Sequence, residues 1–159
     1  MKYRVGLGFD VHELKDGSKL YLGGIEIPSD KGAVGHSDAD VLIHAICDAM
    51  LGAAGMRDIG YHFSNKDERW RNADSKLFLT EVTRMVTEAG WKTENLDCTL
   101  VLEAPKIGSY VDVMKQTLAS IIGISPMDIS IKATTNETMG YVGRRDGLNA
   151  MAVVLLYKE

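Results

Sequence analysis

The apolar positions along the chain predict three helices and several strands. Apolar residues at helical spacing, followed each time by a glycine that favours a helix end, occur in residues 38–54, 75–89 and 109–122. Strand-like apolar runs, two of them in a hairpin around Gly23-Gly24, occupy residues 3–9, 19–28, 96–104, 128–135 and 148–158. We therefore expect one domain, residues 1–159, of the α/β class: an α+β sandwich in which helices pack on one face of a mixed sheet.

The first predicted helix carries polar residues on a surface that is otherwise apolar. Asp40, His44 and Asp48 are four residues apart, so they would stack on one face of the helix. One interpretation is a core histidine that is hydrogen-bonded to a neighbouring aspartate. The other is that His44 binds a metal ion, and that Asp40 and Asp48 orient it or contact a substrate. Ser37 is the predicted N-cap, and free amide groups at this helix end would favour a phosphate.

Asp10 and His12 are candidates for two further metal ligands. They lie two residues apart at the end of the first predicted strand, so both side chains point to the same side of it. With His44 they would form a site of three protein ligands and one open position, the pattern of a catalytic zinc ion. Taken alone, the Asp-x-His pair is a weak signal that also fits a turn aspartate beside an exposed histidine.

A polar, glycine-rich segment near the C-terminus suits the binding of an oxyanion. Residues 132–147, KATTNETMGYVGRRDG, combine hydroxyl groups, cations and glycines at a strand end. Glu137 is the exception, because a carboxylate repels phosphate. It would fit if it held a divalent cation such as Mg²⁺ that itself contacts phosphate oxygens. A polar hairpin without a ligand is the alternative.

Charge and composition narrow the classes of partner. The net charge of −4 argues against a general nucleic-acid binder, which would normally present a basic face. Cys47 and Cys98 lie among apolar residues, which fits free thiols in a reducing compartment. The chain has neither the apolar run of a membrane span nor a signal peptide at residues 1–12. We expect no membrane partner and a cytoplasmic protein, or the mature form of an organellar one.

Several separate segments together resemble one enzyme family. GFDVH, HSDADVLIHAICDAMLGAAG, DIG, EAPK and KATTNETMGYVGR follow the order and spacing of the 2-C-methyl-D-erythritol 2,4-cyclodiphosphate synthases of the non-mevalonate isoprenoid pathway. The resemblance implies a homotrimer with active sites between subunits. It also implies a reaction in which the 2-phosphate of 4-diphosphocytidyl-2-C-methyl-D-erythritol 2-phosphate attacks the β-phosphorus. The products would be a cyclic diphosphate and CMP.

The resemblance also implies a role for individual residues. Asp10, His12 and His44 would bind a catalytic Zn²⁺, and Glu137 a second divalent ion, Mg²⁺ or Mn²⁺. His36 and Thr135 would stabilise the transition state. The remaining implied substrate contacts are Ser37, Asp58, Ile59, Gly60 and residues 63–67, including Phe63 and Asp67, for the methylerythritol phosphate, Ala104, Pro105, Lys106 and Thr134 for the cytidine diphosphate, and Tyr141 and Arg144.

The sequence departs from the family pattern at three places. FSNKD replaces F-P-D-x-D after the first helix, TTNE replaces T-T-T-E, and GRRDG replaces Gly-Arg-x-Glu-Gly. In the family, the positions of Phe9, Arg144 and Asp146 lie near the trimer axis, where isoprenoid diphosphates can bind. Three other functions stay open: a metal-dependent phosphoesterase, a non-catalytic nucleotide-binding module and a purely structural trimer.

Overall fold

The computed structural model describes residues 1–64 and 66–159. Its helices, short 3₁₀ turns (η) and strands follow one another in the order β1 (Lys2–Asp16), β2 (Leu20–Leu22), β3 (Ile25–Ile27), β4 (Lys31–Val34), α1 (Val41–Ala54), α2 (Ile59–His62), η1 (Glu68–Trp70), α3 (Ser75–Glu88), β5 (Lys92–Val101), η2 (Gly108–Tyr110), α4 (Val111–Ile122), η3 (Pro126–Asp128), β6 (Ile129–Thr134), α5 (Gly140–Gly143) and β7 (Gly147–Lys158). The described part of the chain contains no helix that is both long and apolar enough to cross a membrane.

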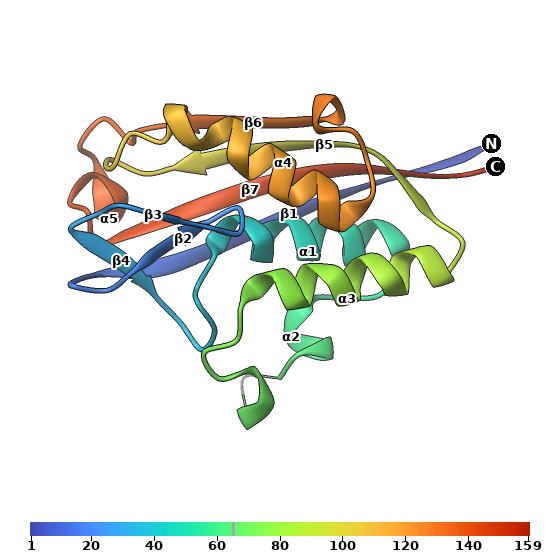
Figure 1. Ribbon diagram of the computed structural model, residues 1–159, viewed down its shortest axis with the longest axis horizontal. Helices are drawn as coiled ribbons and strands as arrows, with labels where there is room; N and C mark the ends of the chain where they lie inside the picture. Colours follow the sequence, from blue (N-terminus) through green and yellow to red (C-terminus); the bar gives the residue numbers. More distant parts are fainter. Residues whose placement is uncertain (65) are drawn as a thin grey trace.

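Five strands form a mixed sheet in the order β4-β1-β7-β5-β6. The long strands β1 and β7 run antiparallel, with Lys2 opposite Lys158 at one end and Glu13 opposite Gly147 at the other. The two termini therefore lie together at one end of the molecule (Figure 1). β5 and β6 are parallel, whereas β5 and β7 are antiparallel. The expected mixed sheet is confirmed, and β2 and β3 form the expected hairpin around Gly23-Gly24.

The long helices α1, α3 and α4 cover one face of the sheet (Figure 1). α1 packs directly on β1 because Gly6 and Gly8 leave room for its backbone. A Cβ atom at Gly6 would overlap the carbonyl oxygen of Ala49, and one at Gly8 would overlap that of Ala45. The buried residues of α1, among them Leu42, Ile46 and Met50, fill the layer between the sheet and α3. This close approach brings the middle of α1 next to β1.

The opposite face of the sheet is apolar and exposed. Its residues alternate along β1 and β7 with residues that face the helices, as expected for strands. The exposed members are Tyr3, Val5, Leu7, Phe9, Val11, Met151 and Val153. Contiguous apolar surfaces of this kind mark contacts with other molecules. We call this surface the bare sheet face.

The sequence-based boundaries differ from the structure in several places. β1 continues to Asp16, seven residues past the expected end at Phe9, because it pairs with β7 up to Glu13 and with β4 from Glu13 to Asp16. Asp10 and His12 thus lie within the strand and not at its end. The segment between the first two long helices contains α2 and η1, and α5 lies in the C-terminal polar segment. β5 spans residues 92–101 instead of 96–104.

The first helix begins at Val41 and not at residue 38. Its N-cap is Asp40, whose side chain accepts a hydrogen bond from the amide of Ile43. The prediction that Ser37 is the N-cap is therefore wrong. Asp40 prevails because its carboxylate also accepts bonds from the amides of Gly23 and Gly24, at 3.0 and 2.7 Å. This buried carboxylate takes up the amide of Ile43, and a phosphate near this helix end stays a prediction.

Candidate metal centre and substrate cavities

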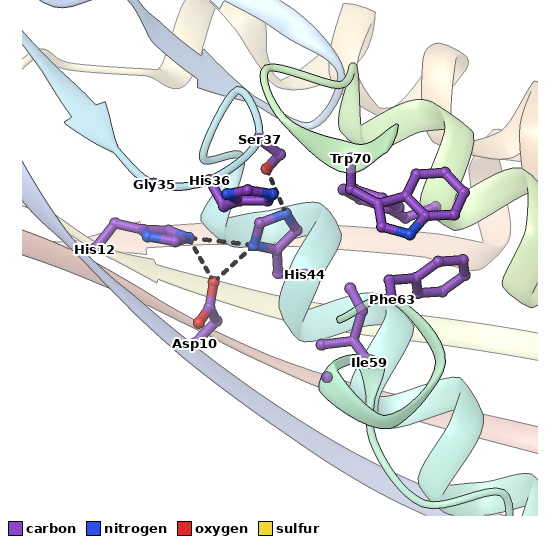
Figure 2. Close-up of a pocket in the computed structure, with 11 residues that line it drawn as sticks. Asp10, His12, Gly35, His36, Ser37, His44, Ile59, Phe63 and Trp70 are labelled. Atoms are coloured by element: carbon purple, nitrogen blue, oxygen red, sulfur yellow. Dashed lines mark hydrogen bonds and ion pairs between the residues drawn. The ribbon is translucent and has the colours of Figure 1, made fainter. Parts of the chain in front are cut away.

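Asp10, His12 and His44 meet where α1 crosses β1. The Oδ2 atom of Asp10 lies 2.9 Å from Nε2 of His12 and 3.1 Å from Nδ1 of His44. The two imidazole nitrogens are 3.2 Å apart. Within residues 1–64 and 66–159, these three side chains form the one group whose ligand atoms could hold a metal ion. Figure 2 shows the three side chains converging on a common point.

The donor set fits a small divalent cation. Nitrogen and oxygen ligands at about 2.0 Å from a tetrahedral zinc ion lie about 3.3 Å from one another. The three observed separations, 2.9 to 3.2 Å, are close to that edge length. Two imidazoles and one carboxylate match the ligand types of catalytic zinc sites. The sequence-based expectation that strand and helix bring these residues together is confirmed.

Charge in the cluster is set by the pairing of the carboxylate with the two imidazoles. Burial would raise the pKa of Asp10, but hydrogen bonds from His12 and His44 outweigh it and lower the pKa to about 2. Burial would likewise lower the pKa of His44, yet the hydrogen bond to Asp10 raises it above its usual value. Asp10 is therefore ionised at neutral pH. A bound cation would replace the proton on His44.

The three ligands line a cavity of about 350 Å³. Residues from four other parts of the chain complete its wall, namely Gly35, His36, Ser37, Ile59, Gly60, Phe63, Trp70 and Phe78. Phe63 packs edge-on against Trp70 and obliquely against Phe78, with ring centroids 5.2 and 5.1 Å apart. The cavity thus has a polar floor at the three ligands and an aromatic side wall (Figure 2). Such a mixture suits a small ligand with one charged and one apolar part.

A second cavity, of about 430 Å³, lies at the other edge of the sheet. Its lining includes Pro105, Lys106, Thr134 and Thr135. The carboxylate of Glu103, which also lines it, accepts hydrogen bonds from the amides of Asn136 and Thr138, at 2.8 and 3.3 Å. These bonds hold the turn that carries Glu137, whose φ is +51°. The turn is thereby fixed beside the second cavity.

Comparison with known proteins assigns the chain to a family. The model of the YgbB family matches residues 3–157. The chain belongs to the YgbB family. A 2-C-methyl-D-erythritol 2,4-cyclodiphosphate synthase of Cytophaga hutchinsonii is 58% identical over 99% of both chains. One from Bacteroides thetaiotaomicron is 49% identical over the full length of both.

Solved structures of YgbB-type proteins have the same fold. A 2C-methyl-D-erythritol-2,4-cyclodiphosphate synthase is 38% identical with a TM-score of 0.90, and the match covers 97% of this chain and all of the other. A further structure of this synthase contains bound CDP, with the same identity and score. The bifunctional IspDF from Campylobacter jejuni is 35% identical with a TM-score of 0.95; the match covers 99% of this chain but 43% of that one.

The structure brings together two groups of the predicted site residues. His36, Ser37, Ile59, Gly60 and Phe63 line the first cavity with the three candidate metal ligands. Pro105, Lys106, Thr134 and Thr135 line the second. The two candidate transition-state residues, His36 and Thr135, thus lie in different cavities of the chain. Their roles stay predictions.

Other predicted site residues line neither cavity. Asp58 caps α2 through the amide of Tyr61. Asp67 caps η1 and pairs with Arg69, although its carbonyl oxygen lies 3.4 Å from Nε2 of His36. The remaining ones are Ala104, Glu137, Tyr141, whose hydroxyl accepts a bond from Asn149, and Arg144, which pairs with Asp146. Asn65, within the predicted 63–67 contact segment, lies outside the described residues.

The carboxylates of Asp40 and Asp48 accept no hydrogen bond from the imidazole of His44, so the prediction that they orient it is wrong, whereas a substrate contact stays a prediction. The side chain of Asp40 is fully buried in its cap, and Oδ1 of Asp48 accepts a hydrogen bond from the amide of Ile59 at 2.7 Å. Instead, Nε2 of His44 faces two hydroxyl groups, Oγ of Ser75 at 3.0 Å and Oγ of Ser37 at 3.2 Å. Sequence reasoning missed Ser75, Trp70 and Phe78. Helical periodicity placed Ser75 in the second helix but gave no sign that the start of that helix meets the first.

Proposed function

We propose that the chain acts as a cyclodiphosphate synthase of the non-mevalonate isoprenoid pathway, working as one domain. It would convert 4-diphosphocytidyl-2-C-methyl-D-erythritol 2-phosphate to 2-C-methyl-D-erythritol 2,4-cyclodiphosphate and CMP. An oxygen of the 2-phosphate would bond to the β-phosphorus, and the bond from that phosphorus to the bridging oxygen would break, so that CMP leaves with this oxygen. The observation that carries the proposal is the Asp10-His12-His44 cluster beside a cavity, in a chain of this family.

Asp10, His12 and His44 would hold Zn²⁺, and Glu137 would hold Mg²⁺ or Mn²⁺. Bound divalent cations supply positive charge that offsets the repulsion between two phosphate groups. That repulsion amounts to roughly 4 kcal/mol for two unit charges at about 4 Å and an effective dielectric constant of about 20. Since about 1.36 kcal/mol corresponds to a factor of ten in rate, the offset is worth several orders of magnitude. The nucleophile is already an anion, which explains why the site needs no strong base.

The chain's own residues would position the two ends of the substrate. In the first cavity, Ser37 and Phe63 would contact the methylerythritol phosphate, and His36 would stabilise the transition state. In the second, Lys106 and Thr134 would bind the cytidine diphosphate, and Thr135 would act on the transferred phosphate. Phosphoryl transfer asks mainly for positioning and charge stabilisation, which such contacts provide.

A homotrimer would bring the two cavities together. β1, which carries the metal ligands, is separated from β6 by β7 and β5. Three strand spacings amount to about 14 Å, too far for one phosphate to contact both groups of residues within a single chain. A neighbouring copy that packs its sheet on the bare sheet face would supply the second cavity and remove apolar surface from water. A cytoplasmic location stays a prediction.

The test is to incubate the zinc- and Mg²⁺-loaded protein with substrate and to follow the products by ³¹P NMR. A cyclic diphosphate together with CMP is the expected result. Linear phosphates would instead indicate a metal-dependent phosphoesterase that activates water at the same site. Unchanged substrate, with CMP bound equally well after metal removal, would indicate a nucleotide-binding module and overturn the proposal.

A further inference from the structure

Ser75 links His44 to a carboxylate on the side away from the metal centre. It is the first residue of α3, and none of its surface is exposed. Its hydroxyl group lies 3.0 Å from Nε2 of His44 and donates a short hydrogen bond to Oδ1 of Asp38. Its amide donates to the other oxygen of the same carboxylate, at 3.0 Å. Both oxygens of the Asp38 carboxylate therefore accept hydrogen bonds from Ser75.

The direction of these hydrogen bonds is fixed by the carboxylate. An ionised carboxylate only accepts, so the single proton of the Ser75 hydroxyl points to Asp38. The hydroxyl oxygen then meets His44 with a lone pair, so Nε2 of His44 carries an N–H. When a cation displaces the Nδ1 proton that faces Asp10, the Nε2 proton stays in place and Nδ1 is left with its lone pair for the metal. Nδ1 is the atom that faces Asp10 and His12.

We infer that Asp38 and Ser75 form a positioning pair that keeps His44 in the tautomer able to bind a metal through Nδ1. This inference deepens the proposed function and rests on the metal site proposed there. The pair does not contact the cluster itself; it acts through the imidazole. Partners on the far side of a ligating histidine set the ring orientation and the donor atom.

Ser37 adds to the arrangement but does not replace Ser75. Its hydroxyl oxygen lies 3.2 Å from Nε2 of His44 and accepts a hydrogen bond from the amide of Ala39, also at 3.2 Å. Within the described residues, the hydroxyl of Ser37 has no carboxylate partner. Because Nε2 of His44 already carries a proton, the Ser37 proton can turn to the oxygen of Ser75, 3.4 Å away, but not to His44. The orientation of the Ser75 proton is the one that the structure fixes.

The test measures zinc affinity in S75A by competition with a chelator. We expect zinc to bind about 10- to 100-fold more weakly than in the parent protein. T80A is the matched control, because Thr80 lies in the same helix and loses a hydroxyl bond to the carbonyl of Lys76 without touching His44. T80A is expected to bind zinc like the parent. D38N alone should weaken zinc binding. The double variant D38N/S75A should bind zinc as weakly as S75A does, because Asp38 acts through Ser75.

The outcomes separate this inference from the metal site itself. Failure of the parent protein to bind zinc would overturn the site, whereas equal affinity of parent and S75A would overturn only the positioning pair. Should S75A fail to fold, ¹⁵N NMR of the zinc-loaded parent decides which nitrogen of His44 carries the proton. A proton on Nε2 supports the inference, and a proton on Nδ1 refutes it.

Discussion

The Nδ1 atom of His44 lies 3.1 Å from Oδ2 of Asp10, although 34 positions separate the two residues in the chain. One belongs to α1 and the other to β1, so their distance depends on how closely the helix approaches the strand. Gly6 and Gly8 permit this approach, since side chains there would meet the backbone of α1. The close packing of α1 on β1 therefore also sets the geometry of the candidate metal centre.

Replacing His44 by alanine is expected to abolish zinc binding and activity while the fold remains. The variant keeps two ligands, too few to hold the ion against a chelator. Metal analysis of the purified protein measures the effect, and circular dichroism checks the fold. H62A is the control: His62 bonds the carbonyl of Met56 and lies outside the metal cluster. One full zinc ion per chain in H44A would contradict the assignment.

The zinc-free protein is expected to lose stability as the pH rises above 6.5. The pKa of His44 is raised by Asp10, so the folded state holds a proton that the unfolded chain releases near pH 6.5. That stabilisation is complete below 6.5 and disappears as the pH passes the raised pKa. The matching contribution of Asp10 is present above about 3.8 and is lost as the pH falls toward 2.

Zinc reverses this trend because it competes with the proton on His44. The difference in Tm between zinc-loaded and zinc-free protein should therefore grow from pH 6 to pH 8. Thermal unfolding at several pH values, with and without a chelator, measures it. A difference that is constant over this range would show that His44 does not exchange a proton for the metal.

The order of the main elements was predictable from the sequence because it depends on local periodicity. The apolar stripe of α3 and the alternation in β7 are read from residues that are neighbours in the chain. The same holds for Asp10 and His12, whose spacing alone places them on one side of a strand. The metal centre was predictable because its third ligand, His44, interrupts an otherwise apolar helix.

The errors concern features that depend on contacts between distant segments. Asp40 looked like a partner of His44 but caps its own helix, since the hairpin glycines Gly23 and Gly24 approach it from elsewhere in the chain. β1 is longer than expected because β4 and β7 supply partners for residues that rarely favour strands. Ser75 was missed for the same reason: its role exists only once α3 meets α1.

The cap at Asp40 is expected to contribute more to stability than the cap at Asp74. D40A leaves three amides, those of Gly23, Gly24 and Ile43, without this acceptor and should cost about 3 kcal/mol or more. D74A removes the exposed cap of α3 and should cost about 1 kcal/mol. Urea unfolding of both variants gives the comparison. Equal losses would show that the link to the hairpin contributes nothing.

Glycine at position 8 is expected to be required for the packing of α1 on β1. G8A places a methyl group against the carbonyl of Ala45 and should destabilise the fold by about 2 kcal/mol or more. G52A, a glycine substitution in α1, is the control, because a Cβ there meets nothing within 4 Å. It should stabilise the protein by about 0.5 to 1 kcal/mol, since alanine favours helix. If G8A unfolds at the parent's urea concentration, the close approach is not needed.

A charge in the middle of the bare sheet face is expected to prevent assembly. Leu7 is 68% exposed and is flanked on β7 by Val153, so L7D would place a carboxylate where the proposed trimer buries apolar surface. Light scattering coupled to size-exclusion chromatography should report the mass of one chain for L7D and of three for the parent protein. L77D is the control, because Leu77 is similarly exposed, at 57%, but lies on α3. It should keep the parent's mass.

Because each active site would draw residues from two chains, L7D should lose cyclase activity while the zinc content of each chain stays at one. A trimeric L7D, or a monomeric L7D with full activity, would refute the shared active site.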